Sequence, residues 1–105
     1  MFLERRQVSR KTPDDGKLEI TRVAAAPLRA LPPEFTLEVN GARGRGRIGE
    51  MECMCRGEAE RHVHYFLESE LLKSLPAGGH VTLDMRDDDG ERGRHGSAVV
   101  AVASV

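Results

Sequence analysis

The chain has 105 residues, enough for one hydrophobic core but not for two. Charged residues make up 31% of it and nearly balance, with a formal net charge of −1, which argues against a nucleic-acid binder that depends on long-range attraction. No apolar run is long enough to span a bilayer, and the start Met-Phe-Leu-Glu-Arg-Arg is too charged for a secretory signal, so we expect a cytoplasmic protein without membrane contact.

The first 17 residues lack a hydrophobic period and contain the turn-like run Asp14-Asp15-Gly16. They are predicted to form either a mobile arm or a short edge strand over residues 2–8, ahead of a single globular domain at residues 18–105. Residues 17–24 have the pattern of a first strand. Residues 25–33 contain three prolines and are predicted to connect that strand to the next one.

A β-hairpin follows. Asn40-Gly41 lies between an alternating apolar strand and a second extended run, and both residues tolerate the positive φ of a type I′ turn. A two-residue loop fixes the register, so that three arginines face the first strand: Arg43 opposite Glu38, Arg45 opposite Thr36 and Arg47 opposite Glu34. Because side chains alternate between faces, the arginines point to solvent and the apolar residues of the first strand point to the core.

These arginines form a candidate surface for an anionic partner. Since Arg45 faces neutral Thr36, its guanidinium would be free to hold a phosphate or carboxylate bidentately. The alternative is that Arg43, Arg45 and Arg47 form the solvated face of an amphipathic hairpin and make cross-strand ion pairs. Arg6 and Arg10, from the basic N-terminal arm, are added to the candidate site. The partner would be a nucleotide, a nucleic acid or an acidic protein surface.

Residues 58–75 allow two predictions. Apolar residues recur at helical spacing, Gly78-Gly79 provides a stop and early glutamates suit a helix N-terminus, so one helix is favoured. The competing prediction is a strand over residues 62–67 followed by a short helical turn. Further on, residues 81–86 alternate between apolar and polar. Residues 97–105 are almost continuously Ala and Val, as in a strand that is buried on both faces.

Two close pairs of metal-ligating residue types occur in the middle of the chain: Cys53 with Cys55, and His62 with His64. On neighbouring strands they would present four ligands to one tetrahedral zinc ion, which requires residues 62–64 to be extended. On a helix the two histidines diverge and the cysteines become small core residues. A chain without a cofactor is favoured, and zinc is the alternative. No catalytic motif is recognisable, so we expect no enzyme activity.

The second half of the chain resembles a PilZ domain, a small β-barrel that binds cyclic di-GMP. The similarity lies in Phe-Leu-Glu-Ser from Phe66, in Leu-Pro-Ala-Gly-Gly-His-Val-Thr-Leu-Asp-Met from Leu75 and in Gly-Ser-Ala-Val-Val-Ala-Val from Gly96. The family's Arg-x-x-x-Arg pair is matched by Arg6 and Arg10. Its Asp/Asn-x-Ser-x-x-Gly motif has no counterpart. The resemblance implies a barrel, an extended segment at residues 62–67 and a degenerate cyclic-dinucleotide effector.

Together these patterns predict an α+β or mostly β fold, an antiparallel sheet or small barrel of about four to six strands with one helix at about residues 58–75. The favoured function is a small, non-catalytic regulatory or adaptor module that contacts an anionic partner through the arginine-lined hairpin. An exposed sheet edge would also allow a protein-interaction role, including a homodimer.

Overall fold

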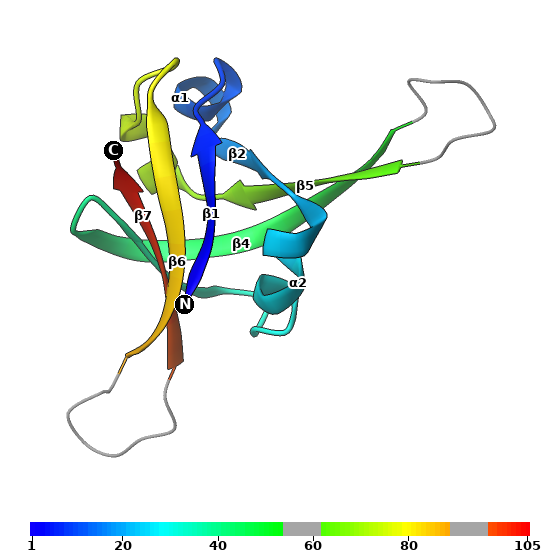
Figure 1. Cartoon of the computed structure of the whole chain (residues 1–105), viewed down its shortest axis with the longest axis vertical. Helices are drawn as coiled ribbons and strands as arrows, with labels where there is room; N and C mark the ends of the chain where they lie inside the picture. The colour runs from blue at the N-terminus through cyan, green and yellow to red at the C-terminus, as the bar shows by residue number, and fades with distance from the viewer. Residues whose placement is uncertain (54–61, 89–96) are drawn as a thin grey trace.

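The computed structural model describes residues 1–53, 62–88 and 97–105. In these ranges the chain forms seven strands, two α-helices and one 3₁₀-helix (Figure 1). The elements in chain order are β1 (Phe2–Gln7), α1 (Lys11–Asp15), β2 (Lys17–Ile20), α2 (Arg22–Arg29), β3 (Phe35–Val39), β4 (Ala42–Cys53), β5 (His62–Glu68), the 3₁₀-helix η1 (Glu70–Ser74), β6 (His80–Asp88) and β7 (Ser97–Ser104).

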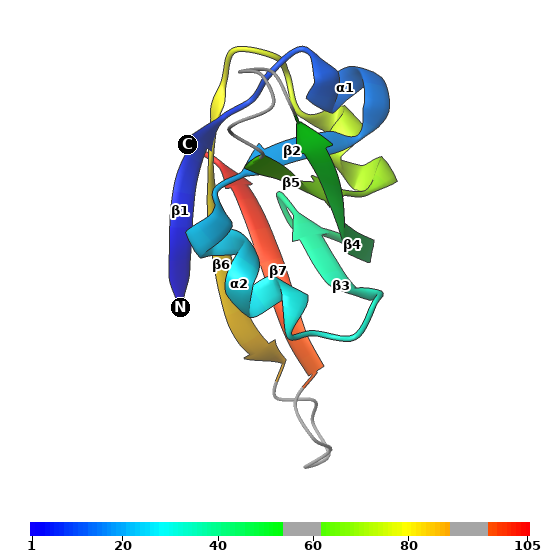
Figure 2. The same cartoon turned by 90° about the vertical axis from the view of Figure 1, so that its right-hand side faces the viewer.

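The strands form one curled sheet with the order β1-β6-β7-β3-β4-β5-β2. All neighbours are antiparallel except β3 and β7, which are parallel. The sheet curls into a nearly closed small barrel with β1 and β2 at its two edges (Figures 1 and 2). The predicted class, a mostly β sheet or small barrel, is confirmed. The strand number exceeds the predicted range because residues 62–68 add a strand and residues 2–7 form the edge strand β1.

The predicted helix over residues 58–75 is wrong in the part that the structure describes. His62–Glu68 is strand β5 and Glu70–Ser74 is η1, as in the competing prediction, while residues 58–61 lie outside the described residues. Tyr65 and Leu67 are buried in the core, and β5 pairs with β4 on one side and β2 on the other. A helix here would leave the backbone groups of both neighbours without partners, a larger loss than helical spacing can offset.

Helix α2 begins inside the predicted first strand. Thr21 is its N-cap and accepts a hydrogen bond from the backbone N–H of Ala24 at 3.2 Å, so β2 ends at Ile20. Residues 25–33, which were predicted to be a connector, therefore begin inside a helix. Ala25 and Leu28 of this helix are buried in the core, so α2 supplies the covering helix that was predicted further along the chain.

Side chains join the two edge strands across the remaining gap. The carboxylate of Glu4 on β1 accepts hydrogen bonds from the backbone N–H of Thr21, at 3.0 Å, and from its hydroxyl. Arg6 Nε donates to the backbone carbonyl of Glu19 on β2 at 3.0 Å. The seam between β1 and β2 is thus closed by side-chain contacts where backbone pairing stops.

Strand β7 lies inside the sheet, between β6 and β3, and the predicted burial on both faces holds around Val99 and Val100, whereas Ala103 is exposed. Val100 belongs to the core, whereas Val99, on the opposite face, is equally inaccessible. In the register, Arg86 of β6 lies opposite Val99, and Ala101 of β7 lies opposite Glu38 of β3. Arg86 and Glu38 form an ion pair, which therefore spans β7 on its outer face.

Candidate binding site

The hairpin has the predicted geometry at its turn. Asn40 and Gly41 both have positive φ, 48° and 91°, as a type I′ turn requires. The pairs from Val39 with Ala42 to Phe35 with Gly46 follow the predicted register. The Asn40 side chain also donates a hydrogen bond to the hydroxyl of Ser104 on β7, at 2.9 Å, and accepts one from the backbone N–H of Ser104, at 2.8 Å. These bonds fix the turn to β7. The first half of β4 is therefore held rigidly.

The three hairpin arginines point to solvent as predicted, and each is engaged by a carboxylate. Arg45 Nη1 lies 2.9 Å from Glu34 Oε2, Arg47 Nε lies 3.1 Å from Glu68 Oε1 and Arg43 Nε lies 4.0 Å from Glu38 Oε1. Arg45 lies opposite Thr36 as predicted, but the prediction that its guanidinium would be free is wrong, because Glu34 reaches it diagonally. Arg47 does not pair with Glu34, because β3 starts at Phe35 and β4 changes partner there, placing Arg47 opposite Glu68 of β5.

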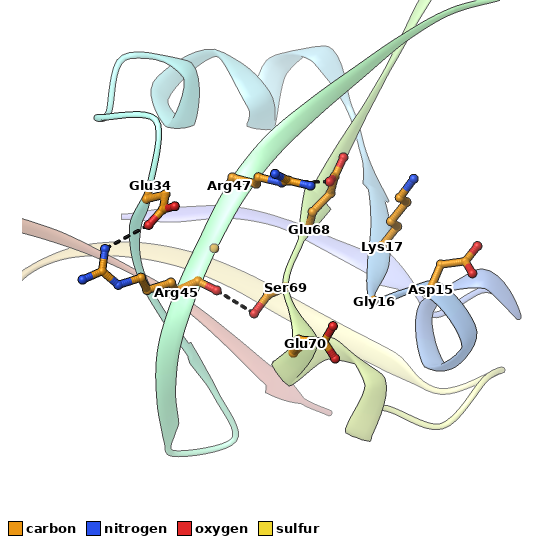
Figure 3. A pocket seen from close by; sticks show the side chains of 10 residues that line it. Asp15, Gly16, Lys17, Glu34, Arg45, Arg47, Glu68, Ser69 and Glu70 are labelled. Carbon is orange, nitrogen blue, oxygen red and sulfur yellow. Dashed lines mark hydrogen bonds and ion pairs between the residues drawn. The ribbon is translucent and has the colours of Figure 1, made fainter.

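Arg45 and Arg47 line an open pocket of about 290 Å³, which we call the Arg45 pocket (Figure 3). One wall consists of residues 45–47 of β4 together with Glu34. The opposite wall is the turn from α1 into β2 at residues 15–17, and the floor is the segment from the end of β5 to the start of η1, residues 68–70. The second wall and the floor were not predicted, because an arm was expected over residues 1–17 and one helix was favoured over residues 58–75.

Short polar contacts hold the pocket together. Gly16, in the left-handed conformation at φ 69°, caps α1, and its carbonyl accepts the backbone N–H of Ser69 at 2.9 Å. The hydroxyl of Ser69 donates to the backbone carbonyl of Arg45 at 2.7 Å and accepts from the N–H of Leu71 at 3.2 Å. Ser69 therefore ties the α1–β2 turn, β4 and η1 to one another.

Arg45 has unused hydrogen-bonding capacity in this pocket. Its side chain is 81% exposed, and among the described residues it is bound through Nη1 alone. Arg47 is 68% exposed and pairs through Nε with Glu68, whose carboxylate lies above Gly49. A guanidinium carries five N–H donors, so an incoming carboxylate can bind Arg45 without first displacing Glu34.

The structure places the two N-terminal arginines elsewhere. Arg6 closes the β1–β2 seam, with its Nε 3.8 Å from Glu4 Oε2 in addition to its bond to Glu19. Arg10 lines a different pocket, of about 410 Å³, beside residues 7–9 and 77–78. Neither lines the Arg45 pocket, and neither does Arg43.

The candidate zinc ligands lie on the ribbon formed by β4 and β5. Residues 62–64 are extended, which the metal interpretation required, and the register places Cys53 opposite His62 and Met51 opposite His64. Cys55 lies outside the described residues. His64 Nδ1 lies 2.7 Å from Glu19 Oε2 on β2. Within the described ranges, no three His, Cys, Asp or Glu side chains are grouped closely enough to bind a metal ion.

Comparison with protein-family models, with curated proteins and with solved structures finds no significant match to this chain. Among residues 1–53, 62–88 and 97–105, no helix is both long and apolar enough to cross a membrane.

Proposed function

We propose that this chain is a small, non-catalytic adaptor module that binds a carboxylate-bearing segment of a partner protein in the Arg45 pocket. The observation that carries the proposal is the state of Arg45. Its guanidinium is 81% exposed at the wall of a preformed pocket, and it is bound by Glu34 on one side only. A planar guanidinium with free N–H groups on a rigid strand is suited to hold a carboxylate in a defined direction.

The charges around Arg45 favour a protein over a nucleic acid as the partner. Glu34, Glu68 and Glu70 all line the same pocket, and a phosphate backbone would be repelled by them. A protein segment presents single carboxylates that can approach Arg45 without an adjacent row of negative charges. The near-neutral net charge of −1 agrees with this choice, since strong nucleic-acid binders are usually basic.

The test is a titration of the ¹⁵N-labelled chain with a short peptide that carries well-separated Glu residues among neutral ones, followed by NMR. We expect weak, saturable shifts of the amides of Arg45, Arg47 and Ser69. Arg45→Gln should weaken the affinity by up to about five-fold, the upper end of the range for one exposed ion pair. Arg22→Gln removes the same charge at an exposed site on α2 and should leave the affinity unchanged.

The proposal is wrong if Arg45→Gln and Arg22→Gln bind the peptide with equal affinity. It is also wrong if no amide near the pocket shows a saturable shift. A single-stranded oligonucleotide of equal charge serves as the competing ligand. If it binds more tightly than the peptide, the choice of a protein partner is wrong.

A second candidate function is the binding of a cyclic dinucleotide. The nearly closed barrel and the extended residues 62–68 agree with the resemblance to PilZ domains, and Arg6 and Arg10 match the arginine pair of that family. Isothermal titration with cyclic di-GMP tests this function. Binding that is lost in Arg10→Ala and kept in Arg5→Ala, a variant of an exposed residue in the same N-terminal segment, would support it. The absence of heat at high micromolar ligand would exclude it.

A further inference from the structure

Glu68 lies between two of the basic residues that line the Arg45 pocket. The register places Arg47 of β4 opposite Glu68 on one side and Lys17 of β2 opposite it on the other. Arg45, the third basic residue of the lining, lies opposite Thr36 instead. Arg45 is therefore the one cation of this lining that Glu68 does not face across the sheet.

The carboxylate of Glu68 is directed to Arg47 and not to Lys17. Its Oε1 lies 3.1 Å from Arg47 Nε (Figure 3), whereas none of the described side chains forms an ion pair with Lys17. Gly49 makes this position possible, because a Cβ at Gly49 would overlap Glu68 Oε2 and lie 2.8 Å from Glu68 Cδ. The space left by the missing side chain of Gly49 thus holds the carboxylate beside Arg47.

The carboxylates beside the two arginines differ in their exposure to solvent. The side chain of Glu68 is 18% exposed, whereas that of Glu34, the partner of Arg45, is 60% exposed. Solvent and salt screen the charge of an exposed group much more than that of a largely buried one. A carboxylate that approaches Arg47 is therefore repelled by Glu68, whereas a carboxylate that approaches Arg45 meets the better screened charge of Glu34.

Arg45 and Arg47 are two residues apart on β4, so their Cα atoms are about 7 Å apart, the repeat of an extended chain. An extended peptide with the pattern Glu-x-Glu has the same spacing and could place one carboxylate at each arginine. We propose that Glu68 is the residue that disfavours this two-point binding and so makes the Arg45 pocket selective for single, well-separated carboxylates. This inference rests on the proposed function, because it names the residue that sets the ligand class of the same pocket.

The test compares two peptides of equal length and composition, capped at both ends, each with two Glu residues as its only charges. In one peptide the pair is Glu-x-Glu, and in the other several neutral residues separate the two. Each is titrated into the ¹⁵N-labelled chain, and we expect the wild-type affinities to agree within about two-fold. Glu68→Gln keeps the size of the side chain and removes its charge. This variant should bind the Glu-x-Glu peptide about two- to five-fold more tightly than the other, the range for one added exposed ion pair.

Glu70→Gln is the matched control, because Glu70 also lines the pocket but pairs with Lys73, at 3.1 Å, and not with Arg47. It should bind the two peptides with the wild-type ratio of affinities. In the double variant Glu68→Gln/Arg47→Gln the preference for Glu-x-Glu should vanish, because the second arginine is gone.

Three results would overturn the role of Glu68: a wild-type chain that already prefers the Glu-x-Glu peptide, a Glu68→Gln variant that does not gain this preference, or a Glu70→Gln variant that gains it to the same extent. In each case, binding of the separated peptide that depends on Arg45 leaves the proposed function in place. If neither peptide binds the wild-type chain, the proposed function is wrong as well.

Discussion

Glu4 accepts two of the hydrogen bonds that close the barrel at the seam between β1 and β2. Its carboxylate is 13% exposed and bonds both the backbone N–H and the hydroxyl of Thr21, the N-cap of α2. Removing it leaves these groups unpaired at the seam and takes a favourable negative charge from the start of a helix.

We therefore expect Glu4→Ala to lower the free energy of unfolding by about 1–3 kcal/mol, measured by urea denaturation. Glu70→Ala, which removes an exposed partner of one surface pair, should change it by less than about 0.5 kcal/mol. Equal effects of the two variants would show that the contacts of Glu4 do not stabilise the fold.

Gly16 and Gly78 separate two costs of replacing a glycine by alanine, the strain of a positive φ and the steric clash of the added Cβ. Both have positive φ, 69° and 91°, but only at Gly16 would an added Cβ meet the backbone, 2.5 Å from the carbonyl oxygen of Ser69. We expect Gly78→Ala to cost about 1–2 kcal/mol for its conformation alone. Gly16→Ala should cost about 1 kcal/mol more, because the Arg45 pocket must deform. Thermal unfolding of both variants measures the difference, and a smaller loss at Gly16 would contradict it.

For single residues, the sequence predicted which way the arginine side chains point better than it predicted which carboxylates they pair with. The Asn40-Gly41 turn determined the register, and the register determined that Arg43, Arg45 and Arg47 face solvent. The ion-pair partners depended on where β3 begins and on which strand lies beyond Gly46. The second does not follow from local alternation, because it is set by the pairing of β4 with β5, a distant segment.

Strand β5 is the element for which local pattern and tertiary structure disagree most. Its residues have helical spacing with Leu71 and Leu75, yet they also alternate, with Tyr65 and Leu67 in the core and His64 on the other face. Two neighbouring strands supply backbone partners to β5, and the sequence by itself does not reveal them. The apolar pattern of a segment only seven or eight residues long is therefore compatible with both a helix and a strand. Pairing with the neighbouring strands selects the strand.

The ribbon of β4 and β5 also bears on the zinc interpretation. His64 lies opposite Met51 and is held by Glu19, so its register partner is not one of the residue types that commonly bind zinc in proteins. We expect the purified chain to contain much less than one zinc ion per chain by mass spectrometry of its metal content. A content of about one zinc per chain that falls in Cys55→Ser, with the fold retained, would contradict this expectation.

The sheet has two edges, β1 and β2. At the β2 edge, two backbone carbonyls accept hydrogen bonds from side chains of the same chain. Along β2, the carbonyl of Lys17 accepts the Thr12 hydroxyl at 2.8 Å, and the carbonyl of Glu19 accepts Arg6 Nε at 3.0 Å. Blocked edges discourage pairing with a second chain. We therefore expect a monomer of 11.6 kDa in sedimentation equilibrium at micromolar concentration. A species of twice this mass would show that another surface, or the β1 edge, mediates dimerisation.

The position of β7 has a consequence for how this molecule acquires its structure during synthesis. The strand that leaves the ribosome last among the seven is an interior strand of the finished sheet, which joins β6 to β3. Its parallel partner β3 was translated about sixty residues earlier, and contacts between such distant segments form slowly. Until β7 emerges, the nascent chain holds two separate groups of strands with exposed apolar faces, a state in which chaperones would bind.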